Sequence, residues 1–249
     1  MYISQIMNYN TKDYYFASYN NVIDMCKDRG YTTKDNVDIE SFKIEAADFE
    51  QRYKDHESDH RVFNVPFGEL FDENGLPVYI TMIESNRDPK NFVKIILQSI
   101  YDDTKNIVTF SKEKDAYRYE ILDKIHCIII HNIESIKSGG SQFHHNFELF
   151  SVKRMFFNVT KHKDVPEHIL LDEKERKEIF ETKNITFATC PKILSDDPVN
   201  LYYNGKPGQV YKIIRNKKGI YFRTIVPGKP SLFFTQLRSQ LIKSVKKVK

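Results

Sequence analysis

Asp72 and Glu84 are the acidic residues whose spacing comes closest to that of a metal-dependent nuclease. In such a site two carboxylates bind Mg²⁺, and a lysine two positions after the second acid orients or activates water. The residue two positions after Glu84 is Asn86, so this lysine is missing. We interpret the acidic pair as a chance match and keep a Mg²⁺-dependent, nuclease-like enzyme as an alternative function.

Two other groups of reactive residues are also incomplete. Residues 205–208 read G-K-P-G, which is shorter than a G-x-x-x-x-G-K-[ST] phosphate loop, and Pro207 lacks the N–H that a phosphate cradle needs. His144 and His145 stand at no recognised spacing from Cys127 for a base and its nucleophile. We therefore predict no catalytic residue, no metal ligand and no cofactor.

The three cysteines, Cys26, Cys127 and Cys190, form no C-x-x-C pair, so we expect buried free thiols. The longest apolar run, at 127–130, is far shorter than the roughly 20 residues that span a bilayer. Residues 1–15 lack the basic-then-apolar order of a signal peptide. We expect an intracellular protein with no membrane partner and no small-molecule substrate.

Charge divides the chain into unlike halves. Residues 1–148 carry 17 Lys and Arg against 25 Asp and Glu, a net charge of −8, whereas residues 149–249 carry 21 against 9, a net charge of +12. Affinity for phosphates grows with the number of cations that displace counterions, so the first half is expected to contact nucleic acid only locally and weakly. The halves are expected to face different partners.

Hydrophobic spacing predicts an α/β layer with partly parallel strands in the first half. Phe16, Tyr19 and Cys26 recur at helical spacing, with Gly30 where a C-terminal cap belongs. Further helices are predicted at 42–53, 91–101 and 115–122, and strands at 61–65, 78–83, 107–110 and 126–131. Residues 138–141, S-G-G-S, break the pattern, so we predict a domain junction between them and Leu149.

The second half is predicted to be a small α+β unit with a mixed sheet. We expect a strand at 155–159, a helix at 172–181, a turn at 196–198 and a hairpin formed by 209–215 and 219–226. The last strand places Ile220, Phe222, Thr224 and Val226 on one face. Residues 229–249 are basic and fit an amphipathic helix that docks on protein or nucleic acid, or else a solvated end.

Short motifs in this half resemble those of the fifth shared subunit of eukaryotic nuclear RNA polymerases, whose C-terminal module also occurs by itself as a small archaeal RNA polymerase subunit. They are F-N-V-T at 157–160, V-P-E-H at 165–168, D-P-V at 197–199, G-Q-V at 208–210 and K-I-I-R at 212–215. M-C-K-D-R-G-Y at 25–31 resembles the signature of the family's N-terminal jaw module. Both signatures together favour the two-module, eukaryotic-type form.

The resemblance implies a jaw with a nuclease-like α/β fold at 1–148, an assembly module at 149–228 and a basic extension at 229–249. Such subunits pack against the largest polymerase subunit, sit near downstream DNA and carry no polymerase chemistry. The family's T-P-S-A motif near DNA is replaced here by S-K-E-K at 111–114 or I-E-S-I at 133–136. This divergence and the extension are also compatible with a homologue from a large DNA virus.

The resemblance and the basic hairpin together suggest contact residues. The predicted subunit interface consists of Val165, Pro166, His168, Asp197, Pro198, Tyr202, Gln209, Lys212, Arg215 and Arg223. Possible jaw contacts are Lys27, Arg29 and Tyr31, although cations at a helix end also stabilise its negative pole by roughly 0.3 to 1 kcal/mol. Cations interleaved with aromatics suit phosphates or an acidic protein groove, and a solvated face is the alternative.

We therefore predict a non-catalytic structural subunit of a multisubunit DNA-directed RNA polymerase. Its expected partners are the largest subunit, other polymerase subunits and, weakly, downstream DNA. A cellular form would lie in the nucleus, and a viral form in the virion or a cytoplasmic viral factory. A free-standing DNA-binding protein is a further alternative, which would need a salt-sensitive affinity that the net charge of −8 in the first half disfavours.

Overall fold

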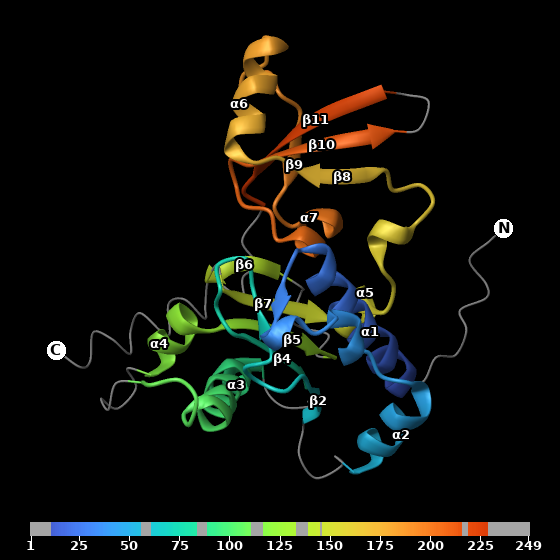
Figure 1. Ribbon diagram of the computed structural model, residues 1–249, viewed down its shortest axis with the longest axis vertical. Helices are drawn as coiled ribbons and strands as arrows, with labels where there is room; N and C mark the ends of the chain where they lie inside the picture. The colour runs from blue at the N-terminus through green and yellow to red at the C-terminus, as the bar shows by residue number, and fades with distance from the viewer. Residues whose placement is uncertain are drawn as a thin grey trace. The chain divides into compact units, whose positions relative to one another are not determined.

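The computed structural model describes residues 11–55, 61–83, 89–110, 117–132, 139–144, 146–215 and 219–228. They divide into two compact units, an N-terminal unit that ends at Phe157 and a C-terminal unit spanning Asn158–Pro230 (Figure 1). The predicted domain boundary between 148 and 149 falls inside a strand of the N-terminal unit. The prediction for 229–249 lies outside the described residues.

The N-terminal unit is built on a mixed five-stranded sheet in the order β2-β4-β5-β7-β6. The three central strands are parallel: β4 (Val78–Ile83), β5 (His126–His131) and β7 (Phe147–Ser151). The antiparallel edges are β2 (Arg61–Asn64) and β6 (Gly139–His144). The expected strands at 61–65, 78–83 and 126–131 are thus confirmed, and β-branched residues predominate in β4 and β5.

Helices lie on both sides of this sheet (Figure 1). On one side α3 (Pro89–Thr104) and α4 (Tyr117–Lys124) pack Leu97, Ile100 and Ile121 against Ile129 and Leu149. On the other side are α1 (Thr11–Asp28) and α5 (Val152–Met155), where the Ser18 hydroxyl donates to the Val152 carbonyl at 3.0 Å. The helices expected at 91–101 and 115–122 are confirmed as α3 and α4.

The end of α1 has the cap that Gly30 predicts. Gly30 has a φ of 74°, its N–H bonds to the Lys27 carbonyl at 2.9 Å, and the Tyr31 N–H bonds to the Cys26 carbonyl at 3.0 Å. This pair of bonds is a Schellman motif, in which a glycine adopts the left-handed conformation at no steric cost. The chain leaves the helix in a fixed direction and forms β1 (Thr32–Thr33), which pairs with β3 (Leu70–Phe71).

Three predictions for the first half need correction. The helix expected at 42–53 is a 3₁₀ turn, η2 (Ile39–Phe42), followed by α2 (Ala46–Asp55), because Asp38 caps the turn through the Glu40 N–H and Lys43 is extended. A short 3₁₀ turn, η1 (Lys34–Asn36), precedes them. The strand expected at 107–110 is absent: the N–H groups of Ile107 and Val108 bond back to the Thr104 carbonyl at the end of α3.

The third correction concerns the predicted junction between 138–141 and Leu149. Gly139–His144 and Phe147–Ser151 are strands β6 and β7, which pair with each other. Phe147 and Leu149 alternate into the core, and this burial outweighs the glycines that the sequence offers as a break.

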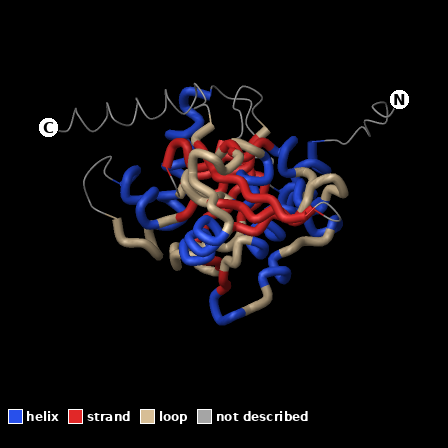
Figure 2. Tube along the Cα trace, turned by 90° about the horizontal axis from the view of Figure 1, so that it is seen from above, coloured by secondary structure: helices blue, strands red, loops and turns tan. Residues whose placement is uncertain are grey.

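The C-terminal unit contains a mixed four-stranded sheet in the order β8-β10-β11-β9, as expected for an α+β unit. The strands are β8 (Glu167–Leu170), β9 (Lys192–Leu194), β10 (Val210–Arg215) and β11 (Gly219–Val226). β10 pairs antiparallel with β8 and β11, whereas β11 and β9 are parallel. The predicted hairpin is confirmed. Figure 2 colours the helices blue and the strands red.

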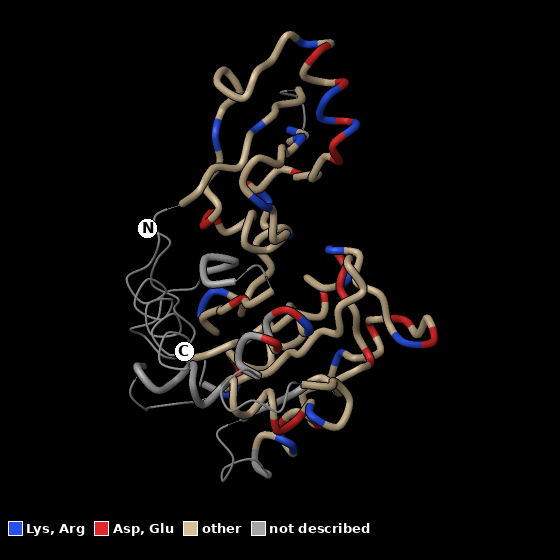
Figure 3. The backbone as a smooth tube through the Cα atoms, turned by 90° about the vertical axis from the view of Figure 1, so that its left-hand side faces the viewer, with Lys and Arg blue, Asp and Glu red and all other residues tan. Residues whose placement is uncertain are grey.

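Two helices and a 3₁₀ turn complete this unit: η3 (Val159–Lys161), α6 (Glu173–Thr182) and α7 (Pro198–Tyr203). The strand predicted at 155–159 is wrong, because α5 occupies its start and Asn158 caps η3 through the Thr160 N–H at 2.9 Å. The helix predicted at 172–181 is confirmed, with Asp172 and Glu175 forming a capping box. Acidic and basic residues alternate along α6 (Figure 3). None of the helices in the described parts of the chain is long and apolar enough to cross a bilayer.

Candidate subunit interface

The sheet of the C-terminal unit has two faces that the strand register defines. Lys212 lies between Ile169 and Phe222, and Ile214 lies opposite Ile220. We call this side the open face. Its members near the hairpin turn are Glu167, Ile169, Lys212, Ile214, Ile220 and Phe222, and those further away are Lys192, Leu194, Val210, Thr224 and Val226. The other side, the buried face, carries Tyr211, Ile213, Ile225 and Ile193, which pack together with Leu170 and Tyr203.

This register separates the predicted contact cations. Arg215 and Arg223 follow the alternation of the buried face, whereas Lys212 belongs to the open face. The Arg215 guanidinium lies over the Tyr221 ring, 5.0 Å from its centroid. The hairpin therefore presents its cations on opposite sides of the sheet.

His168 lies within electrostatic reach of both arginines. Its Nδ1 donates to the Pro166 carbonyl at 2.7 Å, and its ring meets that of Tyr211 edge-on. Burial is the largest cause that lowers the pKa of His168, and the positive charges of Arg223 and Arg215 act in the same direction. This histidine is therefore neutral at pH 7 and takes a structural hydrogen bond.

Most other predicted interface residues hold turns together. Asp197 accepts from the Val199 N–H at 2.9 Å and Pro198 begins α7, as the turn expected at 196–198 requires. Tyr202 is buried and its hydroxyl accepts from the Asn158 amide at 3.0 Å. The Gln209 side chain accepts from the Lys206 N–H at 2.6 Å. Val165 and Pro166 are half-buried in the turn before β8.

Asn200 is a central residue that the motif analysis did not single out. Its amide nitrogen donates to the carbonyls of Ser195 and Gly205, each at 3.0 Å, and its amide oxygen accepts from the Tyr211 hydroxyl at 3.0 Å. A Cβ on Gly205 would lie 2.5 Å from this oxygen and 2.5 Å from the Ile225 Cδ1. Position 205 therefore has room only for glycine. We call this group the neutral network.

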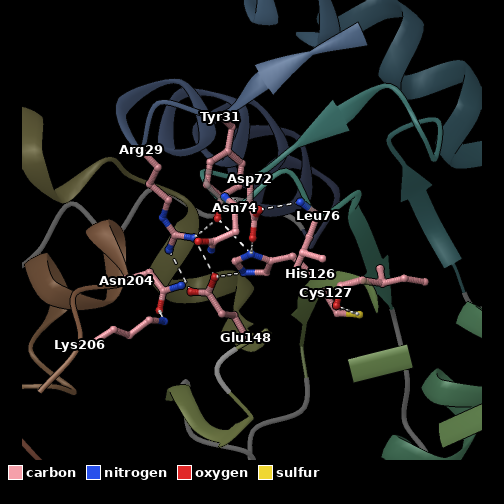
Figure 4. Close-up of polar contacts among 11 residues, drawn as sticks. Arg29, Tyr31, Asp72, Asn74, Leu76, His126, Cys127, Glu148, Asn204 and Lys206 are labelled. Carbon is pink, nitrogen blue, oxygen red and sulfur yellow. Dashed lines mark hydrogen bonds and ion pairs between the residues drawn. The ribbon is translucent and has the colours of Figure 1, made fainter. Parts of the chain in front are cut away.

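A different polar group lies in the N-terminal unit (Figure 4). Arg29 forms two parallel bonds to the Glu148 carboxylate, at 2.7 and 2.9 Å. His126 Nε2 lies 2.8 Å from Glu148 Oε1, and His126 Nδ1 lies 2.9 Å from Asp72 Oδ2. All four side chains are buried, and Arg29 also donates to the Tyr31 hydroxyl at 3.1 Å. We call these five residues the ionic network.

The contacts of His126 indicate that its ring is positively charged. Both ring nitrogens face carboxylate oxygens, which only accept hydrogen bonds when ionised, so both nitrogens carry a proton. Burial opposes this charge, but the bonds to Asp72 and Glu148 outweigh it and raise the pKa of His126. Burial likewise opposes ionisation of Glu148, yet Arg29 and His126 hold the pKa of this carboxyl well below its usual range. The network balances two positive charges with two negative ones.

The ionic network accounts for two of the three possible jaw contacts. Arg29 and Tyr31 are buried in it, so the M-C-K-D-R-G-Y signature ties the exit of α1 to the first residues of β5 and β7. Lys27 is exposed and pairs with Glu40. Sequence reasoning missed the network because Asp72, His126 and Glu148 are far apart in the chain and form no motif.

The same contacts describe the surroundings of Asp72, one member of the acidic pair. Asp72 Oδ1 accepts from the N–H groups of Asn74 and Leu76, each at 2.9 Å, while Oδ2 faces His126. Both oxygens are therefore occupied; Glu84 and Asn86 lie outside the described residues. Within the described ranges, no group of three His, Cys, Asp or Glu residues is placed to hold a metal ion. The three cysteines are free and buried, as expected.

Comparison with known proteins shows which family the chain belongs to. Residues 157–225 match the family described as RNA polymerase Rpb5, C-terminal domain. The DNA-directed RNA polymerase subunit Rpo5 of Pyrococcus horikoshii is 40% identical over 68 residues, which cover 26% of this chain and 83% of that protein. The chain belongs to the Rpb5 family. The resemblance to the fifth shared polymerase subunit is thereby confirmed.

Other members of the Rpb5 family match different lengths of the chain. The DNA-directed RNA polymerases I, II, and III subunit rpabc1 of Dictyostelium discoideum is 37% identical over 68 residues, which cover 27% of this chain and 34% of that protein. Subunit RPABC1 of Caenorhabditis elegans is 27% identical over 199 residues, which cover 78% of this chain and 85% of that protein. The longer match includes much of the N-terminal unit.

Proposed function

We propose that this Rpb5-family chain is a non-catalytic structural subunit of a multisubunit DNA-directed RNA polymerase. The observation that carries the proposal is the family match over 157–225, which spans almost the whole C-terminal unit. The proteins compared with it are named as polymerase subunits. In this role the C-terminal unit docks on the largest subunit and the chain supports RNA synthesis through assembly.

The N-terminal unit acts in this proposal as a jaw near downstream DNA. Two observations support it: a sheet with helices on both sides, compatible with a nuclease-like α/β layer, and the C. elegans match over 78% of the chain. The net charge of −8 at 1–148 makes the DNA contact weak and local. In this proposal the jaw is the N-terminal unit, which ends at Phe157, and the assembly module is the C-terminal unit Asn158–Pro230, in place of the boundary between 148 and 149.

Some of the proposed interface residues offer charge to the partner, and the others hold the turns around them in place. Lys212 on one side of the sheet, and Arg215 and Arg223 on the other, offer charge to acidic protein surfaces. The residues that hold the turns around them are His168, Asp197, Pro198, Tyr202 and Gln209. A cellular form would act in the nucleus, a location that suits the relatives from Dictyostelium and C. elegans, whereas a viral form would act in the virion or a cytoplasmic factory.

Affinity purification from the native source tests the proposal. The tagged full-length chain is expected to recover the two largest polymerase subunits in equal amounts, and the complex should persist through a high-salt wash. Quantitative mass spectrometry measures the ratios. Recovery of the chain as a monomer free of polymerase subunits would contradict the proposal.

A further inference from the structure

The two faces of the C-terminal sheet are unequally covered. On the buried face, Tyr211, Ile213 and Ile225 are almost inaccessible to solvent. On the open face, Ile169, Leu194 and Ile220 are 37%, 51% and 54% exposed, whereas Val210 and Thr224, on the same side but away from the hairpin turn, are buried. Large apolar side chains gathered on an exposed surface mark an interaction site more often than a solvated one.

The apolar side chains of the open face that lie near the hairpin turn are adjacent to one another. Ile169, Lys212 and Phe222 stand side by side on β8, β10 and β11, and Ile214 lies opposite Ile220 one step further along. Directly opposite side chains on paired strands have their Cβ atoms about 4.5 to 5.5 Å apart, so these residues form one surface. Leu194 pairs with Val226 at the other end of β11, and the buried Thr224 separates it from this surface.

The charges on this face restrict its occupant. Lys212 lies among apolar residues near the middle, while Glu167 and Lys192 stand on the two edge strands. Nucleic acid would require several cations, and one central lysine does not supply them. A second copy docked face to face around a two-fold axis would bring the two Lys212 ammonium groups toward each other.

We infer that the open face is the surface by which the C-terminal unit docks on a neighbouring polymerase subunit. The partner surface is apolar and carries a carboxylate opposite Lys212, because an ammonium group enclosed by apolar surface is stable only when it is paired. The inference rests on the proposed function and specifies which side of the sheet carries the contact. Arg215 and Arg223, on the other side of the sheet, then lie at the margin of this interface or outside it.

The test compares open-face variants with a matched control in the full-length chain expressed in its native source. The double variant Ile169→Asp with Ile220→Asp places carboxylates at exposed positions of this surface, so the core is untouched. The control, Ile107→Asp, changes an equally exposed isoleucine of the N-terminal unit. We expect the double variant to recover about tenfold less polymerase than the wild type, and the control to match the wild type.

Lys212 tests the charge of the partner. Lys212→Glu is expected to reduce recovery strongly, because it places a carboxylate against a carboxylate, whereas Lys212→Arg should retain most of it. A photo-crosslinker at position 220 should join the chain to a polymerase subunit, and this measurement does not depend on the stability of the aspartate variants.

The outcomes separate the inference from the proposed function. Wild-type recovery by both the folded double variant and Lys212→Glu would overturn the inference and leave the proposed function standing. A crosslink from position 220 to a second copy of the chain or to DNA would also overturn it. Failure of the wild-type chain to recover polymerase would overturn both.

Discussion

The two units of this chain fix their loops to their sheets with different chemistry. In the N-terminal unit, the ionic network joins α1, the turn before β4, and the starts of β5 and β7 through four buried charges. In the C-terminal unit, the neutral network joins the turn before α7, the loop after it and β10 through one amide and one phenol. A buried charge that loses its partner costs more than a buried amide, so the units should differ in their tolerance of substitution and of pH.

The largest effect is expected from Glu148→Leu. This change leaves Arg29 and His126 buried without their shared carboxylate and should destabilise the N-terminal unit by about 3 to 5 kcal/mol. Hydrogen exchange of the β5 and β7 amides in the full chain measures the loss. The control Glu120→Leu breaks a surface pair with Lys124 and should cost less than about 1 kcal/mol. Equal losses in the two variants would show that the ionic network has no special weight.

Gly205→Ala should give the next largest effect, in the C-terminal unit. The added Cβ would lie within 2.8 Å of the Tyr211 hydroxyl and closer still to Asn200 and Ile225. Relief of this overlap should cost about 1 to 3 kcal/mol, measured by exchange of the β10 and β11 amides. Pro207→Ala, at an exposed position of the same loop, is the control. Unchanged protection in Gly205→Ala would mean that the neutral network can shift freely.

Tyr211→Phe removes one bond of the neutral network without adding volume. The Asn200 amide oxygen loses the hydroxyl that donates to it, at a cost of about 1 to 2 kcal/mol. The same exchange experiment applies, and Tyr221→Phe at a partly exposed position is the control. A loss as large as that of Glu148→Leu would remove the contrast between neutral and charged networks.

Changes in pH should have the smallest effect on stability. The titration of His126 in the N-terminal unit and that of His168 in the C-terminal unit should act with opposite signs. The pKa of His126 is raised by folding, so its contribution is complete below the unfolded value of about 6.5 and is lost as pH rises through the folded pKa. The pKa of His168 is lowered, so its contribution is complete above about 6.5 and is lost as pH falls. His131 should also make the N-terminal unit lose stability as pH falls, because burial lowers the pKa of His131 to about 4.

Amide hydrogen exchange is measured between pH 6.5 and 8 and corrected for the intrinsic exchange rate. It isolates the contribution of His126 to the stability of the N-terminal unit. In this window the N-terminal unit of the wild type should lose stability with rising pH. His126→Gln, which is neutral throughout, should be less stable at pH 6.5 and nearly independent of pH. A wild-type unit whose stability does not fall across the window would contradict the cationic assignment of His126.

Elements with a clear local pattern were predictable from the sequence. β4 and β5 have the predicted limits because consecutive β-branched residues fill a strand that is buried on both sides. The hairpin of β10 and β11 was predicted from the N-K-K-G turn and from the alternation of apolar residues in the second strand. The polymerase-family motifs lie in this unit. Predictions failed where tertiary contacts outweighed local preference, as at 107–110, which bonds back to α3, and at 155–159, where the Asn158 side chain caps a turn.

The sequence by itself determined the helix and strand periods, the Gly30 cap, the opposite charges of the two halves and the family signature. The tertiary structure alone decided that Arg29 meets Glu148 across 119 positions of the chain, since the motif around Arg29 says nothing about its partner. It also decided which side of the last sheet is covered. Ile220 and Ile225 are equally apolar, and only packing by the rest of the unit makes one exposed and the other buried.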